Sequence, residues 1–253
     1  MPAPSDMKGK AALITGAAAG LGRATALKLA RAGADICIVD IDAPGLAATA
    51  EAARALGVTS YAHAMDLSVP ENCRAAVAAA IATFGRLDAL CNVAAVFLPA
   101  HTADMSQSDF DKTLAVNLAA PFHLIQAAIP HLLQSRGAVV NVTSCAAHTA
   151  QACSAAYCAT KAGLAHMTKS LATEYMHRHV RFNAVAPGGM MTALAGNLRN
   201  LQDIDVPLMK RVAPLRGLVD IDDVAEMVAF LATDAARGYH GACFSIDNGI
   251  TAG

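Results

Sequence analysis

Tyr157 and Lys161 form a Tyr-x-x-x-Lys unit, and Ser144 precedes the tyrosine by thirteen residues, at the predicted end of a strand. Residues four apart share one face of a helix, so the phenol and the ammonium would be neighbours. A nearby positive charge favours the phenolate, which would bring a group that ionises near pH ~10 closer to neutrality. We therefore expect Tyr157 to act as an acid or a base. On most helices the same pentapeptide is only a surface pair, so the prediction depends on the rest of the chain.

A glycine-rich turn near the N-terminus supplies the strongest support. The apolar run Ala11–Ile14 leads into Thr15-Gly16-Ala17-Ala18-Ala19-Gly20-Leu21-Gly22, and helical spacing follows from Arg23 to Ala32. Glycines allow close backbone approach, and the N-terminus of the next helix offers unpaired N–H groups to an anion such as a pyrophosphate. The dinucleotide fingerprint also requires an acidic residue about 20 positions later, and Asp40 supplies it. The alternative, an ordinary glycine turn of an α/β protein, would not require Asp40.

The length and charge of the chain limit its organisation and its partners. Its 253 residues contain no Pro/Gly/Ser-rich linker, so we expect a single domain over residues 1–253. The formal net charge of -1 leaves no basic excess, so no nucleic-acid partner is expected. Charged residues make up 15% of the chain, below the usual ~25%, and hydrophobic residues make up 55%. Part of the surface is therefore expected to be buried between subunits.

The N-terminal segment and the hydropathy pattern bear on location. Met1 to Lys10 is polar and contains prolines, which is typical of neither a signal peptide nor a transit peptide. No apolar run reaches the roughly 18 residues of a membrane span. We therefore expect a soluble, cytoplasmic protein with no membrane partner.

The cysteines and histidines suggest no metal site. The seven cysteines are odd in number and lack Cys-x-x-Cys spacing, and the nine histidines show no ligand spacing, so neither a disulfide framework nor a zinc site is predicted. Cys145, Cys153 and Cys158 come close to Ser144 or Tyr157 in the sequence. We expect these cysteines to line the wall of the site, and a redox or nucleophilic role is the alternative.

Strand-like runs alternate with helical patterns along the whole chain. This order is typical of βαβ units, so the predicted fold class is α/β: a single-domain, Rossmann-type doubly wound fold with a parallel sheet of about seven strands and helices on both faces. Capping patterns predict helix starts at Ser68, at Ser106, and at Asp220 or Asp222. The predicted strands are Ala11–Thr15, Asp35–Val39, Thr59–Ala64, Ala89–Val93, Ala138–Thr143, Arg181–Ala186 and Cys243–Ile246.

Several polar or turn-forming residues come directly after these predicted strands. In an open doubly wound sheet, ligands bind beyond the carboxyl ends of the strands. We therefore expect these residues to meet at one crevice, although each alone could be a turn former or a strand-end hydrogen bonder. They are Asp66 and Leu67 after the third strand, Asn92 at the fourth, Ser144 after the fifth, and Pro187, Gly188 and Gly189 after the sixth.

In these features the chain resembles the short-chain dehydrogenase/reductase family, from Gly9 to Gly253. The glycine turn resembles the family's T-G-x-x-x-G-x-G motif, and Ser144, Tyr157 and Lys161 match three members of its catalytic tetrad. Further matches are Asp66 to the adenine-contacting aspartate, Asn117 to the tetrad asparagine, Pro187-Gly188-x-Met190-x-Thr192 to the segment that holds the nicotinamide carboxamide, and Asp247-Asn248-Gly249-Ile250-Thr251-Ala252 to the closing D-G-G-x-T motif.

Two segments depart from the family's pattern. Asn92-Val93-Ala94-Ala95 stands where the family usually has N-N-A-G, and Asp247-Asn248-Gly249 replaces D-G-G. The first segment runs past the adenosine in the family, so the change is expected to alter packing or local shape. Neither departure touches the tetrad.

The resemblance implies hydride transfer between NAD and a small-molecule alcohol or ketone. Tyr157 would exchange the substrate proton and Ser144 would hydrogen-bond the substrate oxygen, while Lys161 would lower the phenol pKa and hold the ribose hydroxyls. Asn117 would hold a helix irregularity and a water. The residues expected to bind the cofactor are Gly16, Gly20, Leu21, Gly22, Asp40, Ile41, Asp66, Leu67, Asn92, Tyr157, Lys161, Pro187, Gly188, Met190 and Thr192.

Asp40 predicts NAD rather than NADP, because a carboxylate there would repel a 2′-phosphate and neither Ala19 nor Ile41 supplies a compensating cation. The leading hypothesis is an NAD-dependent oxidoreductase of a secondary alcohol. A 3-oxoacyl thioester reductase is an alternative within the family, which Asp40 disfavours because such enzymes generally prefer NADPH. A non-catalytic NAD-binding protein is a third hypothesis, which the loss of Tyr157 or Lys161 would have favoured.

The segment from residue 188 to 216 is expected to close over the substrate as a lid, with an ordinary amphipathic helix as the alternative. Its apolar residues, Met190, Met191, Leu194, Leu198 and Leu201, predict a substrate with an apolar or cyclic body. In the family, the residues around Phe97 and His148 vary with the substrate rather than with the chemistry. The resemblance also implies a homo-oligomer, either a tetramer or a dimer.

Overall fold

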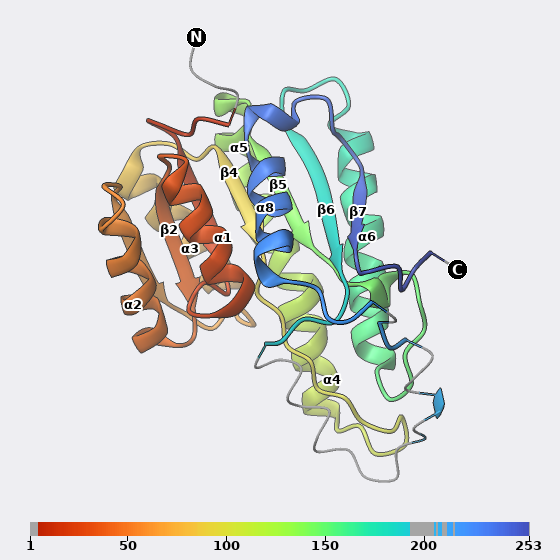
Figure 1. The fold of residues 1–253 in the computed structure, drawn as a ribbon. Coiled ribbons are helices and arrows are strands. Elements are labelled where there is room, and N and C mark those ends of the chain that lie inside the picture. Colours follow the sequence, from red (N-terminus) through yellow and green to blue (C-terminus); the bar gives the residue numbers. More distant parts are fainter. Residues whose placement is uncertain (1–4, 193–204, 206, 209–211, 215, 253) are drawn as a thin grey trace.

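A seven-stranded sheet forms the centre of the computed structural model, which describes residues 5–192, 205, 207–208, 212–214 and 216–252. All strands are parallel, in the order β3-β2-β1-β4-β5-β6-β7 (Figure 1). The predicted α/β fold is thereby confirmed. The strands are β1 (Ala11–Thr15), β2 (Asp35–Asp40), β3 (Ser60–Ala64), β4 (Ala89–Asn92), β5 (Ala138–Val142), β6 (Arg181–Pro187) and β7 (Cys243–Ile246).

Helices cover both faces of the sheet (Figure 1). Helices α1, α2 and α8 pack on one face, and α3, α5 and α6 pack on the other, each group over its own apolar core. The helices are α1 (Gly20–Arg31), α2 (Ala43–Arg54), α3 (Pro70–Phe84), α4 (Gln107–Leu114), α5 (Ala120–Ser135), α6 (Ala155–Glu174) and α8 (Ile221–Ala232), with the short η1 (Ala115–Ala119), η2 (Cys145–Ala147) and η4 (Asp234–Ala236).

The central strands β1, β4 and β5 are mostly apolar because both of their faces are buried. In β1, Ala12 and Ile14 point into the core under α1 and α8, and Leu13 points into the core under α3 and α5. Successive side chains of a strand alternate between faces, so a strand covered on both sides reads as a continuous apolar run. This is why the strand positions could be predicted closely from the sequence.

The helix starts agree with the capping patterns at two of three places. Ser106 accepts a hydrogen bond from the Asp109 N–H at 3.1 Å, and Asp220 accepts one from the Asp222 N–H at 2.9 Å. The prediction for Ser68 is wrong: α3 begins at Pro70 and makes no side-chain cap bond. The Ser68 N–H instead donates to the Asp66 carboxylate at 2.9 Å, in a local turn ahead of the helix.

The strand order reverses at β1, which lies between β2 and β4. At the carboxyl end of β1, the Thr15 hydroxyl accepts hydrogen bonds from the N–H groups of Val93 and Ala94 at 3.0 and 3.1 Å. The segments that follow β1 and β4 are therefore tied together at this edge. Such a reversal point is where doubly wound sheets bind their ligands.

One helical stretch among the described residues, Gln107–Ser135, is long and apolar enough to cross a membrane. It comprises α4, η1 and α5, and 44% of its most apolar window is buried inside the protein. Several of its apolar side chains, including Leu124, Ile125 and Leu132, belong to the core under α3 and α5. The composition of a core helix accounts for the finding equally well, so it is weak evidence for a membrane span.

Candidate active site

A cavity of about 790 Å³ lies at the carboxyl ends of β1, β4, β5 and β6. The glycine turn after β1 lines one part of it, and the segment after β5 and the first turns of α6 line another. Among the described residues, its wall comprises Gly16, Ala19–Gly22, Asp40, Val93–Ala95, Phe97, Val142–Cys145, Gln151, Ser154, Tyr157, Lys161, Pro187–Thr192, Val212–Pro214, Leu218 and Ile250.

Ser144 is the second residue after β5 and stands at the start of η2. Its backbone is extended, with φ of -169°, and its hydroxyl accepts a hydrogen bond from the Ala146 N–H at 3.1 Å. This bond fixes the side chain, which lines the cavity. The hydroxyl also donates to the Cys145 sulfur, at 4.0 Å. A sulfur is a weak acceptor, so an oxygen ligand could take its place.

Tyr157 lies in the first turn of α6, on the same cavity wall as Ser144. Phe97 packs edge-on against the tyrosine ring, with ring centroids 4.8 Å apart and an interplanar angle of 67°. Burial raises the pKa of Tyr157 to about 12, and hydrogen bonding to Ser144 opposes the rise. Phe97 therefore fixes the ring while the phenol stays protonated at neutral pH.

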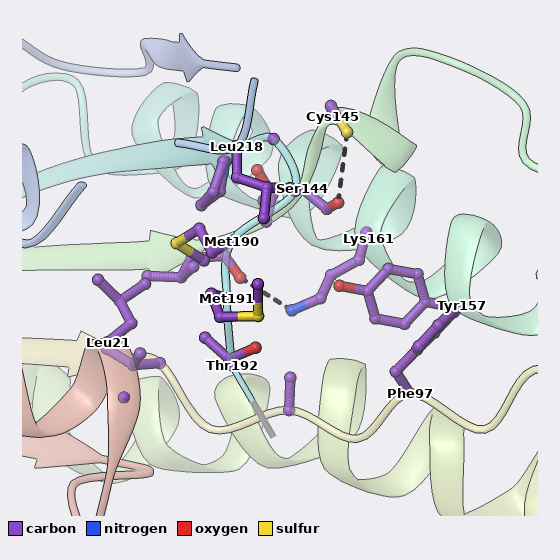
Figure 2. Close-up of a pocket in the computed structure, with 18 of the residues that line it drawn as sticks. Leu21, Phe97, Ser144, Cys145, Tyr157, Lys161, Met190, Met191, Thr192 and Leu218 are labelled. Carbon is purple, nitrogen blue, oxygen red and sulfur yellow. Dashed lines mark hydrogen bonds between the residues drawn. The ribbon is translucent and has the colours of Figure 1, made fainter. Parts of the chain in front are cut away.

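Lys161 lies one helical turn after Tyr157, and only 1% of its surface is exposed. Its Nζ donates to the Val142 carbonyl at 2.9 Å and lies 5.7 Å from the centre of the Tyr157 ring (Figure 2). Burial lowers the pKa of Lys161 to about 8. The predicted pairing is therefore present.

The predicted effect of this pairing on the tyrosine is wrong. The pKa of Tyr157 is raised rather than lowered, because the loss of hydration is the largest influence on the phenol. Burial acts on both members of the pair, since it disfavours the phenolate and the ammonium alike. A sequence spacing predicts that two groups are near each other, but it does not show how far both are removed from water.

Asn117 does not line the cavity; it lies behind it, in η1. This segment is a π-helical turn between α4 and α5, which is the kind of helix irregularity expected at Asn117. The Asn117 side chain accepts from the Val96 N–H at 2.8 Å and donates to the Val96 carbonyl at 2.9 Å. It thereby holds the segment after β4 that carries Phe97. The expected water at Asn117 stays a prediction.

The glycine turn has the shape that an approaching phosphate requires. Gly16 has φ of 68°, and a Cβ there would lie 2.8 Å from the Ala94 Cα. A Cβ at Gly22 would lie 2.0 Å from the Gly16 carbonyl oxygen, so α1 packs closely on the turn. The N-terminus of α1 has no side-chain cap and no acidic residue in its first turn. Its N–H groups are therefore suited to an anion, and the residues present fit a dinucleotide.

Asp40 ends β2 and lines the same part of the cavity as the glycine turn. One carboxylate oxygen accepts from the Ala18 N–H at 3.0 Å, and the other accepts from the N–H groups of Ile41 and Asp42 at 2.7 and 3.1 Å. These bonds hold the carboxylate against the turn. A carboxylate oxygen has lone pairs for a further donor, so Asp40 could also accept from a hydroxyl.

Four predicted cofactor residues do not line the cavity among the described residues. The Ile41 side chain is 70% exposed, and Leu67 packs in the core. Asp66 is exposed and accepts from the Ser68 N–H, which lowers the pKa of its carboxyl. The Asn92 amide donates to Asn141 at 2.8 Å inside the sheet. Their contacts with a cofactor stay predictions.

The remaining predicted cofactor residues do lie on the cavity wall. These are Gly16, Gly20, Leu21, Gly22, Asp40, Tyr157, Lys161, Pro187, Gly188, Met190 and Thr192. Of the predicted lid residues, Met190 and Met191 line the cavity (Figure 2), and Leu194, Leu198 and Leu201 lie outside the described residues.

Several wall residues were not predicted, namely Gln151, Ser154, Leu218 and Ile250. Gln151 and Ser154 occur in the segment that joins Ser144 to Tyr157, and this position is the signal that could have identified them. Leu218 reaches the cavity through the fold: Val219 pairs with Met190 in an isolated parallel bridge. No local sequence pattern indicates that contact.

The cysteines near the site differ in their positions. Cys145 lines the cavity, and burial raises the pKa of its thiol, which favours the wall-lining role over a nucleophilic one. Cys153 lies 3.6 Å from His101 Nδ1, and Cys243 lies 3.7 Å from His148 Nε2. Neither His148 nor Cys153 is among the described wall residues.

The part of the chain that the structure describes contains no cluster of three or more potential metal ligands.

Residues 16–251 match a family model described as enoyl-(acyl carrier protein) reductase. The chain is 38% identical to D-threitol dehydrogenase of Mycolicibacterium smegmatis, over 97% of this chain and 94% of the relative. It is 36% identical to the 2,5-dichloro-2,5-cyclohexadiene-1,4-diol dehydrogenase LinX of Sphingobium indicum, over 98% of each chain. It is also 31% identical to the 3-oxoacyl-[acyl-carrier-protein] reductase FabG of Thermotoga maritima, over 96% and 98% of the two chains.

Solved structures share the fold over nearly the whole chain. A short-chain dehydrogenase from Mycobacterium paratuberculosis bound to NAD has a TM-score of 0.92 and 26% identity, and covers 98% of this chain and 100% of its own. Carveol dehydrogenase from Mycobacterium avium in complex with NAD has a TM-score of 0.88 and 27% identity, over 97% and 99%. A metagenomic blue fluorescent protein in complex with NADPH has a TM-score of 0.87 and 32% identity, over 97% and 99%.

Proposed function

Because this chain belongs to the short-chain dehydrogenase/reductase family, and is therefore an oxidoreductase of CH–OH groups, we propose that it interconverts a secondary alcohol and a ketone with NAD(H). The observation that carries this proposal is the meeting of Ser144, Tyr157 and Lys161 on one wall of a cavity that the glycine turn also lines. Two hydroxyl groups and a buried ammonium at one place suit proton transfer to or from a substrate oxygen.

NAD, when bound, would supply the hydride acceptor or donor at the nicotinamide ring. The residues that would hold it are those of the glycine turn, Asp40 and the segment Pro187–Thr192. Asp40 supports NAD over NADP because its carboxylate would bind ribose hydroxyls and repel a phosphate in their place. Ala19 and Ile41 provide no cation to offset that repulsion.

Each polar residue of the site has a separate task in this proposal. Tyr157 would donate a proton to the carbonyl in reduction and accept one from the alcohol in oxidation. Ser144 would donate a hydrogen bond to the substrate oxygen, where charge develops during the reaction. Lys161 would hold cofactor hydroxyls and supply positive charge near the phenol, and Asn117 would keep Phe97 and the cavity wall in place through Val96.

The wall of the cavity supports a substrate with an apolar or cyclic body. Phe97, Met190, Met191 and Leu218 line it near the reacting groups (Figure 2), and methionine side chains adapt to irregular ligands. The segment 188–216 would act as a lid over this body. A consistent preference for short, charged hydroxy acids over cyclic alcohols would contradict this part of the proposal.

A 3-oxoacyl thioester reductase is the second candidate function. The likeness to FabG favours it, and the reaction would use the same Ser144 and Tyr157. Asp40 weighs against it, because reductases of this kind generally prefer NADPH. A non-catalytic NAD-binding role has no support from the site, since Tyr157 and Lys161 are both present on its wall.

We also propose that the protein is a cytoplasmic homo-oligomer, a tetramer or a dimer, in which α4 and α5 contact a second copy. Phe110 on α4 is 40% exposed and Phe122 on α5 is 44% exposed. No Asp, Glu, Lys or Arg occurs between Lys112 and Arg136. Phe122→Glu would place a charge on this face, so the molar mass from light scattering should fall from that of an oligomer towards that of one chain.

Turnover measurements with the purified protein test the proposed reaction. NAD⁺ would be mixed with a panel of aliphatic, cyclic and aromatic secondary alcohols, and NADH with the matching ketones, while the absorbance of reduced nicotinamide is followed. We expect turnover with at least one pair, and faster turnover with NAD(H) than with NADP(H) at equal low concentration. Turnover of 3-oxoacyl thioesters alone, with NADPH, would favour the second candidate.

A further inference from the structure

Gln151 places a carboxamide on the cavity wall, in the segment between η2 and α6. Among the described residues its one hydrogen bond is from Nε2 to the Cys145 sulfur, at 3.7 Å. A thiol sulfur is a weak acceptor, and the carboxamide oxygen has room for a donor. An oxygen ligand would therefore satisfy Gln151 better than its present partner does.

The sulfur of Cys145 contacts both the Gln151 carboxamide and Ser144, which is one of the proposed reacting groups. The Ser144 hydroxyl lies 4.0 Å from the same sulfur atom that Gln151 contacts (Figure 2 shows Ser144 and Cys145). Ser144 would hold the oxygen that gains or loses a proton, and Gln151 contacts the same sulfur atom, so both side chains belong to one part of the wall. A second oxygen on the neighbouring carbon of the substrate would lie between the reacting carbon and Gln151.

Three other polar side chains of the wall are already bonded to main-chain oxygens. Thr143 Oγ1 donates to the Val185 carbonyl at 2.9 Å, Ser154 Oγ donates to the Ala152 carbonyl at 3.1 Å, and Lys161 donates to Val142 at 2.9 Å. Gln151 thus differs from these three side chains in having only a sulfur partner among the described residues.

We propose that Gln151 binds a second hydroxyl group of the substrate, so that the alcohol is a vicinal diol and its product is an α-hydroxy ketone. This inference rests on the proposed alcohol oxidation. The carbinol carbon loses a hydride to oxidised nicotinamide, its hydroxyl loses a proton to Tyr157, and the second hydroxyl is unchanged. A carboxamide suits that hydroxyl because it can donate to its oxygen and accept its hydrogen. Gln151 is thereby a residue that determines specificity.

Matched pairs of alcohols test this assignment. The two alcohols of a pair share one carbon skeleton, but the first has one hydroxyl and the second has two on neighbouring carbons. The pairs are cyclohexanol and 1,2-cyclohexanediol, 2-butanol and 2,3-butanediol, and 1-phenylethanol and 1-phenyl-1,2-ethanediol. For the skeleton that is turned over best, kcat/KM of the wild-type protein should be about tenfold higher for the diol, which is the effect of one well-formed hydrogen bond. Gln151→Leu, which keeps the side-chain volume, should remove this preference and change kcat/KM for the mono-alcohol by less than about twofold.

Cys145→Ala is the control for a purely structural role. It removes the sulfur partner and leaves the carboxamide, so the preference for the diol should persist. If Gln151→Leu lowers kcat/KM equally for both alcohols, or Cys145→Ala abolishes the preference as Gln151→Leu does, Gln151 only supports Cys145 and the inference is overturned. Turnover of mono-alcohols without any preference for diols would overturn the inference alone, whereas a lack of turnover with every alcohol would overturn the proposed function as well.

Discussion

Lys161→Met is predicted to stabilise the protein at neutral pH while abolishing turnover. Burial lowers the pKa of Lys161 from 10.5 to about 8, because the ammonium loses its hydration. One pKa unit corresponds to about 1.4 kcal/mol, so keeping the buried ammonium charged costs roughly 3 kcal/mol of folding free energy. Methionine retains an unbranched side chain without the charge. Its gain is reduced by the loss of the bond from the charged Nζ to the Val142 carbonyl, which is worth about 1.5–3 kcal/mol, so a net gain of up to about 1.5 kcal/mol remains.

The pH dependence identifies the cause of this gain. Below about pH 8 the folded and unfolded forms of the wild type both carry the Lys161 proton, and the folded form bears the full cost of the buried charge. Between about pH 8 and 10.5 only the unfolded form is protonated, so the stability of the wild type rises with pH. The advantage of Lys161→Met should therefore shrink through this range.

Thermal unfolding of wild type and Lys161→Met between pH 6 and 10 measures the effect. For a chain of this length each kcal/mol corresponds to about 2–4 °C in melting temperature. Lys169→Met is the matched control, because Lys169 lies exposed on the same helix and should give no comparable gain. A destabilised Lys161→Met protein, or a gain that does not change with pH, would refute the reasoning.

Three further predictions concern Ser144, Asp40 and Asn248. Ser144→Ala should lower kcat by about 10²–10³ with little change in the dissociation constant for NAD, and a loss below tenfold in steady-state assays would contradict the role given to its hydroxyl. Asp40→Ala should narrow the ratio of kcat/KM for NAD over NADP, so an unchanged ratio would assign the preference to other residues. Asn248 has φ of 52° and donates to the Gly217 and Leu218 carbonyls at 3.0 and 3.1 Å. Asn248→Asp and Asn248→Gly both lose these donors, but glycine suits the left-handed conformation and a carboxylate at this position would face two carbonyl oxygens. Asn248→Asp should therefore melt about 2–4 °C below Asn248→Gly, and equal melting temperatures would contradict this.

The sheet was predictable because its signals are local. An apolar run bounded by Lys10 and Gly16 marks β1, and the same alternation of runs and helices continues to β7. Helix starts are less certain from sequence, since a serine can bond locally without capping. Ser106 caps α4, whereas the Ser68 N–H bonds to Asp66 ahead of α3.

The sequence predicts which residues come to the site where the order of strands along the chain determines their position. Residues that follow parallel strands come to one edge of the sheet, which brings Ser144 and Pro187 to the same cavity. Side-chain direction does not follow from that order: Asn92 stands at the end of β4 but turns to Asn141 inside the sheet. The pKa of Tyr157 was predicted in the wrong direction, because burial depends on tertiary packing rather than on spacing.

Turnover of Tyr157→Phe tests the central claim most directly. The substitution retains the ring and its edge-on packing against Phe97, and removes only the hydroxyl proposed to exchange the substrate proton. We predict that kcat for alcohol oxidation falls by about 10²–10⁴, while NAD binding measured by calorimetry changes little. Alcohol oxidation near the wild-type rate, with an unshifted pH profile, would contradict the account.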